Sequence, residues 1–103
     1  MTAAVLHILL SLSTEDRHGL GIAADVKAFT NGRLVLGPGT LYGTIKRLLD
    51  AGFVEDLGSP AADDDDPRRR YYRITAKGRR ALEAETAGLA SVLGVARRRL
   101  KTS

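Results

Sequence analysis

The residues best suited to chemistry lie in the stretch GPGTLYGTIKRLLDAG, residues 37–52 of this 103-residue chain. If the stretch is a helix, one side is apolar. The other side and its flank carry Thr40, Tyr42, Gly43, Lys46 and Arg47. Lysine and arginine bind phosphate oxygens, arginine is the commonest partner of guanine, and a glycine allows close approach to a groove floor. The set predicts a DNA-binding surface with Arg47 as the candidate for base readout. The alternative is an ordinary solvated helix face.

A second basic cluster, Arg68, Arg69 and Arg70, could grip phosphates beside the same groove. It follows the aspartate run Asp63–Asp66, so the alternative is pairing within the loop, and both can hold. Four carboxylates would repel DNA, so we expect the tip of this loop to point away from DNA or to be mobile. Adjacent aspartates lack the alternating spacing of a calcium loop, and no metal site is expected.

Catalysis is not expected from this sequence. The chain has no cysteine and two histidines, His7 and His18, with no convergent set of nucleophile, base and orienting residue. His7 lies on an apolar helix and is read as a hydrogen-bonded core or edge residue, and His18 as a helix-start residue. We therefore expect neither an enzyme nor a cofactor.

Hydrophobic periodicity predicts three helices that position the first cluster, at residues 3–12, 19–30 and 38–51. Residues 13–18 are read as a polar turn. The second helix is expected to turn inward Leu20, Ile22, Ala23 and Val26, with Phe29 as a further candidate. Asn31-Gly32 is a strong stop signal, since both residues tolerate positive φ. Pro38 suits the first position of the third helix, with Gly37 as its cap, and Gly52 supplies a left-handed end.

Two strands are expected to position the second cluster, at residues 53–57 and 70–75. The loop at 58–69 between them makes a hairpin with a long tip. Tyr72 and Ile74 have the same parity in the second strand and are expected to face the core. Thr75 suits the cap of a final helix that runs to about residue 101.

The final helix carries a heptad seam that predicts dimerisation. Its members are Leu82, Leu89, Leu93, Ala96 and Leu100. Thr86 interrupts the seam, and Gly88 and Gly94 weaken the helix. The cations at its end, Arg97–Arg99 and Lys101, interact favourably with the helix dipole, and the alternative is a supplementary contact with the DNA backbone. Residues 76–103 contain no aromatic side chain, so a stacking pocket for a flat ligand is not expected between paired helices.

The order helix, helix, helix, strand, strand, helix predicts a fold that is mostly α-helical with a small β-hairpin. It is the order of a winged helix-turn-helix, here followed by a C-terminal dimerisation helix. Residues 1–75 would form the DNA-binding domain and residues 76–103 the dimerisation helix. In this arrangement the third helix reads the major groove, and the hairpin is the wing.

Charge and composition agree with a nucleic-acid partner. The net charge is +4 with a pI near 9.9, and +4 resides in residues 79–103 alone. The longest apolar run, residues 3–12, is too short to span a bilayer and is not read as a signal peptide. The lack of cysteine is compatible with a reducing compartment, so we expect a cytoplasmic protein without a membrane partner.

Three segments together resemble the PadR-like transcriptional regulators: HGLGIAADV (18–26), LGPGTLYGTIKRLLDAGFVE (36–55) and RRRYYRITAKGRRALEAE (68–85). The resemblance implies a homodimeric winged-helix repressor that binds a palindromic operator in double-stranded DNA, near its own gene or a neighbouring one. Two residues depart from the family pattern. Gly37 stands where serine is usual and Leu20 where tyrosine is common, and neither touches the predicted DNA-facing side.

Other functions are left open by the sequence. A winged-helix module that binds protein through its outer faces is the main alternative. An RNA-binding role is weaker, because no aromatic platform for stacking bases is present. A small apolar effector at the dimer interface remains open, and neither the operator nor the effector can be named from the residues.

Overall fold

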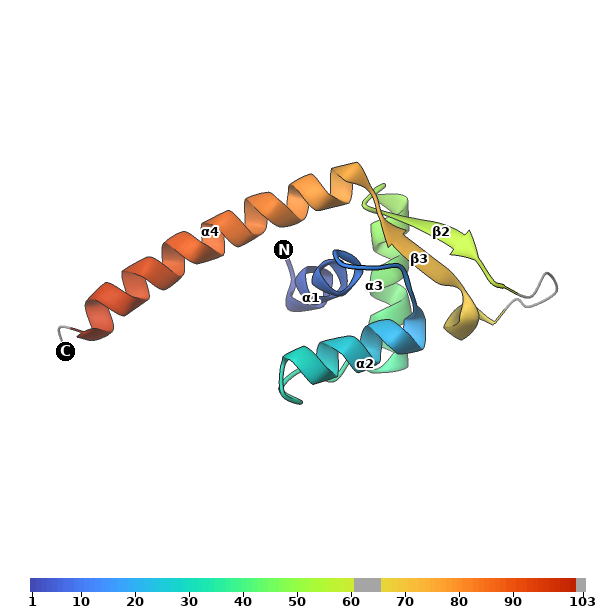
Figure 1. Cartoon of the computed structure of the whole chain (residues 1–103), viewed down its shortest axis with the longest axis horizontal. Helices are drawn as coiled ribbons and strands as arrows, with labels where there is room; N and C mark the ends of the chain where they lie inside the picture. The colour runs from blue at the N-terminus through green and yellow to red at the C-terminus, as the bar shows by residue number, and fades with distance from the viewer. Residues whose placement is uncertain (61–65, 102–103) are drawn as a thin grey trace.

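The computed structural model describes residues 1–60 and 66–101. Three helices form a body, a small sheet lies beside them, and a long helix leaves the body as an arm (Figure 1). The molecule is therefore elongated, measuring 59 × 28 × 21 Å. In chain order the elements are α1 (Ala3–Leu12), β1 (Arg17–His18), α2 (Gly19–Phe29), α3 (Pro38–Asp50), β2 (Val54–Gly58), η1 (Pro67–Arg69), β3 (Tyr71–Ile74) and α4 (Ala76–Lys101).

The helix ends follow from the residues that cap them, and the four predicted helices are confirmed. His18 caps α2, because its Nδ1 accepts a hydrogen bond from the N–H of Gly21 at 2.9 Å. After α2, Asn31 and Gly32 have φ values of 54° and 76°, which end the helix. Gly37 precedes α3 without a side-chain cap, and Pro38 occupies its first turn.

The sheet has three antiparallel strands in the order β1-β3-β2, where the sequence predicted two. The additional strand is β1, which lies in the segment read as a polar turn. It pairs Arg17 with Tyr72 and His18 with Tyr71. A strand of two polar residues has no alternation to detect, and its partner lies more than fifty residues away in sequence. The hairpin of β2 and β3 is confirmed.

The core is one cluster built from all four α-helices and from the sheet. Tyr72 and Ile74 are buried, which confirms the predicted parity of β3. Leu20 is 55% exposed, so its predicted inward position is wrong. Ile22 and Val26, four residues apart, set the buried face of α2, and Leu20 lies about 200° from Ile22 around the helix. In the described part of the chain, the buried hydrophobic residues are Ile8, Leu9, Leu12, Ile22, Val26, Leu36, Leu41, Ile45, Leu48, Val54, Tyr72, Ile74 and Leu82.

Only the first turns of α4 belong to this core. Leu82 is 5% exposed, whereas Leu89, Leu93 and Leu100 are 44%, 49% and 73% exposed. The rest of the helix extends away from the body, as the red end of the chain shows in Figure 1. No helix in the described part of the chain is long and apolar enough to cross a membrane.

Candidate nucleic-acid interface

The position of α3 is fixed by its apolar side. Leu41, Ile45 and Leu48 are each buried in the core. The opposite side is left exposed, and the structure gathers there four of the residues predicted to bind DNA: Thr40, Gly43, Lys46 and Arg47. The guanidinium of Arg47 donates a hydrogen bond to Thr44 Oγ1 at 3.3 Å, one turn earlier. The buried side of α3 thus holds its polar side in a defined orientation.

Three glycines on α3 and its cap have no role in packing. A Cβ at Gly37, Gly39 or Gly43 would meet no atom of the described residues within 4 Å, and none of the three has a positive φ. The fold would therefore accept a side chain at each position. Glycine inside a helix is about 1 kcal/mol less favourable than alanine. The exposed side of α3, which has no side chain at these glycines, therefore suits a partner that approaches the backbone of α3 closely.

Tyr42 lies between two helices. A Cβ on Gly19 would come within 2.6 Å of the Tyr42 ring and hydroxyl, so the ring packs directly on the start of α2. The hydroxyl is buried and has no hydrogen-bond partner among the described residues. Burial raises the pKa of Tyr42, and the nearby charge of Asp66 raises it further. In this position Tyr42 braces α3 against α2, and a contact with DNA would require its hydroxyl to leave the buried site.

Two arginines of the wing, Arg68 and Arg70, are held by carboxylates. Arg68 binds Asp66, with Nη2 and Oδ2 2.6 Å apart, and this pair lies within the loop as one reading of the sequence anticipated. Arg70 instead crosses the hairpin to Asp56, at 2.8 Å. Arg69 is exposed on η1. The remaining aspartates of the run, residues 63–65, lie outside the described residues.

These carboxylates are charged at neutral pH. Hydrogen bonds from the side chain and the backbone N–H of Arg68 lower the pKa of Asp66 to about 2. Burial favours a higher pKa for Asp56, but hydrogen bonds from Arg70 and from the N–H of Gly58 outweigh it and lower the pKa. Phosphate oxygens would therefore compete with existing partners for Arg68 and Arg70.

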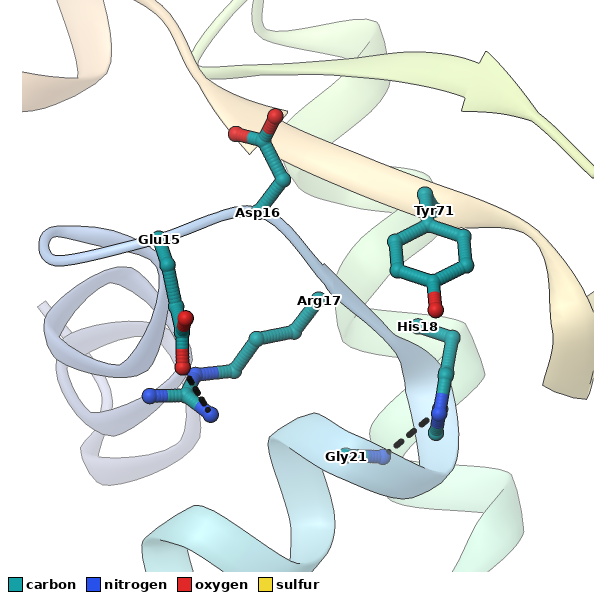
Figure 2. Close-up of a pocket in the computed structure, with 6 residues that line it drawn as sticks. All are labelled: Glu15, Asp16, Arg17, His18, Gly21 and Tyr71. Carbon is teal, nitrogen blue, oxygen red and sulfur yellow. Dashed lines mark hydrogen bonds and ion pairs between the residues drawn. The ribbon is translucent and has the colours of Figure 1, made fainter.

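A shallow pocket opens where β1 meets the start of α2 (Figure 2). Its charged groups and His18 already have partners. Arg17 pairs with Glu15 at 2.9 Å, and His18 caps α2 and meets the Tyr71 ring edge-on with centroids 5.3 Å apart. A hydrogen bond from Arg73 lowers the pKa of Asp16. Across the described ranges no group of three potential metal ligands occurs. The residues that line this pocket therefore connect the sheet to the helices.

The predicted dimer seam divides into two parts. Leu82 belongs to the core of its own chain, and Ala96 is half-buried. Leu89, Leu93 and Leu100 form an exposed apolar row on the projecting part of α4. Val92, which is 64% exposed, extends this row to one side, and the predicted seam did not include it. Its spacing of three residues after Leu89 was the available signal.

A three-helix body, a hairpin wing and an exposed polar face on the third helix define a winged helix-turn-helix protein with an added C-terminal helix. The model of the Transcriptional regulator PadR-like family matches residues 5–84. The chain therefore belongs to the PadR-like family. Its members are transcriptional regulators and not enzymes, which confirms the expectation for catalysis.

Solved structures share the fold. A PadR family transcription regulator from Clostridium difficile has a TM-score of 0.78 and 23% identity, over 96% of this chain and 99% of that one. Bacillus subtilis PadR in complex with operator DNA has a TM-score of 0.71 and 20% identity, over 84% of this chain and 48% of that one.

A relative in sequence is an uncharacterised 37.1 kDa protein in transposon TN4556 of Streptomyces fradiae, 32% identical over 91 residues. The match covers 88% of this chain but only 24% of that protein. The chain thus corresponds to about a quarter of the length of this relative.

Proposed function

We propose that the chain is a DNA-binding transcriptional repressor that acts as a homodimer on a palindromic operator. The exposed side of α3 would enter the major groove, where Arg47 and Lys46 reach base edges or phosphates. Arg68, Arg69 and Arg70 would hold phosphates beside it. The observation that carries the proposal is the side of α3 that combines cations with glycines the fold does not need. The operator complex of Bacillus subtilis PadR, which shares the fold, supports it.

The homodimer would form through the exposed row on α4. A row of leucines open to water on a projecting helix is unfavourable unless another surface covers it. A second copy offers a matching row, and a twofold dimer presents two α3 helices to two half-sites. In such a dimer the two helices would lie about 34 Å apart, or a multiple of that distance.

The first test measures binding to the DNA upstream of the chain's own gene. Binding is monitored by fluorescence anisotropy over a range of salt concentrations, with unrelated DNA as competitor. If each protomer neutralises three to four phosphates, log K should fall against log salt with a slope of roughly −5 to −7. Tight binding that survives the competitor supports the proposal. No binding at low salt would contradict it and favour the protein-interaction module.

Substitutions assign the roles within the interface. Arg47→Ala should relax sequence preference and weaken specific binding by about 1–3 kcal/mol, because a base contact is lost. Arg69→Ala should weaken all sequences alike and reduce the salt slope by about one. Arg80→Ala, an exposed arginine on α4, is the matched control and should change neither quantity. If all three variants bound DNA with the same affinity and the same sequence preference, α3 would not be the helix that reads the operator.

The oligomeric state is tested by light scattering. Leu89→Asp combined with Leu93→Asp should give monomers, because two charges would be buried in the apolar row. Ala84→Asp combined with Ser91→Asp places the same charges on the opposite side of α4 and should leave the mass unchanged. A parent chain that is monomeric at micromolar concentration would contradict the dimer.

A further inference from the structure

Thr75 connects the segment just after α3 with the start of α4. Its hydroxyl donates a hydrogen bond to the carbonyl of Gly52 at 2.7 Å, just after α3. The same hydroxyl accepts a hydrogen bond from the N–H of Gly78 at 3.0 Å, in the first turn of α4. The backbone N–H of Thr75 donates to the carbonyl of Phe53 at 3.0 Å. One side chain thereby satisfies polar groups at both helix ends.

Lys77 reinforces this junction from α4. Its ammonium group donates to the carbonyl of Ala51, the residue that caps the end of α3, at 2.9 Å. It also lies 5.4 Å from the centroid of the Phe53 ring. The carbonyl end of a helix carries partial negative charge, so a cation there is favourable. A side chain of α4 is thus bound to the end of α3.

Gly78 allows the start of α4 to approach the backbone of Phe53 closely. A Cβ at this position would lie 2.1 Å from the carbonyl oxygen of Phe53 and 2.9 Å from its carbon. The first turn of α4 therefore rests directly on the backbone that follows α3. Other contacts tie α4 to α1 and its loop, such as Arg79 with the carbonyl of Ser13 at 3.0 Å, but these do not involve α3.

We propose that Thr75, Lys77 and Gly78 are positioning residues that fix the direction of α4 relative to α3, and so set which half-site spacing the dimer accepts. The inference rests on the proposed function. A helix of 26 residues is about 39 Å long, so a tilt of about 10° at the junction moves its far end by roughly 7 Å. That displacement corresponds to about two base-pair steps of 3.4 Å.

The direction of α4 can be measured without DNA. Because the chain has no cysteine, Thr40→Cys and Ser91→Cys provide two unique sites for spin labels on α3 and α4. Dilution with unlabelled chain confines the measured distance to one protomer. We expect a narrow distribution for the parent and for Thr75→Ser, and a broad or shifted one for Thr75→Val, which loses the hydroxyl.

Thr30→Val is the matched control. The Thr30 hydroxyl also makes two bonds at a helix end, to the carbonyl of Val26 at 2.7 Å and from the N–H of Leu34 at 3.1 Å. Its loss should reduce stability similarly but leave the distance between α3 and α4 unchanged. Lys77→Met and Lys77→Arg form a second pair at an exposed residue, should Thr75→Val fail to fold.

The DNA measurement uses half-sites selected from a random duplex pool, with their separation varied in single base pairs. The parent should prefer one separation by about tenfold over neighbours two base pairs away, a preference set by the two-half-site geometry. Thr75→Val and Lys77→Met should reduce this ratio to about twofold, while affinity for a single half-site is retained. Lys77→Arg and Thr30→Val should keep the parental ratio.

The outcomes separate the inference from the proposed function. Parental distance distributions and parental spacing preference in both Thr75→Val and Lys77→Met would overturn the inference. A parent that binds no member of the pool would overturn the proposed function, and the spin-label distances would still decide whether the junction fixes α4.

Discussion

Helices α3 and α4 are both amphipathic, but their apolar sides are treated differently. In α3, Leu41, Ile45 and Leu48 are covered by the body of the same chain, and the free side is polar. In α4, cover by the same chain ends after the first turns, and the leucines beyond Leu82 face solvent. One helix therefore offers a polar surface with cations, and the other offers an apolar row.

The free surface of each helix is the basis for the partner proposed for it. Cations beside bare backbone fit a polyanion, and apolar side chains fit another apolar surface. The same chain thus presents two surfaces of different chemistry, connected through the hydrogen bonds of Thr75. Substitutions in each helix test this contrast.

Truncation of a leucine should reduce stability strongly in α3 and only slightly in α4. Leu48→Ala in α3 should lower the free energy of unfolding by about 2–5 kcal/mol, because it opens a cavity in the core. Leu100→Ala in α4 should change it by less than about 0.5 kcal/mol. The measurement is urea denaturation of chains that also carry Leu89→Asp and Leu93→Asp. These two substitutions should keep the protein monomeric, so that unfolding reports on the single chain. Similar losses for both variants would show that α4 is covered by its own chain.

Substitution of an exposed glycine should separate stability from binding. A Cβ at Gly43 in α3 or at Gly88 in α4 would meet no atom within 4 Å of the described chain. Alanine at either position should raise the free energy of unfolding by up to about 1 kcal/mol, because helix propensity improves. Thermal denaturation measures this gain.

Only Gly43→Ala should weaken DNA binding, since its methyl group would stand between α3 and the groove floor. Gly88→Ala is the matched control, with the same chemical change on the other helix. If Gly43→Ala binds the operator as tightly as the parent, the bare surface of α3 has no function in close approach.

The smallest expected effect concerns the wing. The pKa of Asp66 lies at about 2 rather than 3.8, because Arg68 favours its charged form. Any stability from this pair is therefore fully present above pH 3.8 and is lost as the pH falls towards 2. An NMR titration of the Asp66 carboxyl carbon should show this midpoint. Arg68→Ala should move the pKa upward, and an unchanged midpoint would exclude the pair.

Much of the fold could be predicted because the signals are local. The start signals at His18, Pro38 and Thr75 and the stop at Asn31-Gly32 place the helices within a residue or two of their observed bounds. The exposed side of α3 also follows from helical periodicity alone, since Thr40, Lys46 and Arg47 cannot share the side of Leu41 and Ile45.

The missed features depend on residues distant in sequence. The packing of Tyr42 on Gly19 and the pairing of Arg70 with Asp56 arise only when separate elements meet. The same is true of β1, which has no pattern of its own and exists because β3 offers it an edge. The roles of the DNA-binding and dimer residues stay predictions until the variants are measured.

The central place of β3 in the sheet also has a consequence for biosynthesis. Both β1 and β2 find their hydrogen-bond partner in β3, and the core is completed by Leu82. A chain emerging from the ribosome at about 5–20 residues per second can form its first helices early, but it cannot close the sheet until residue 74 is available. The body and the wing should therefore become complete together, late in translation.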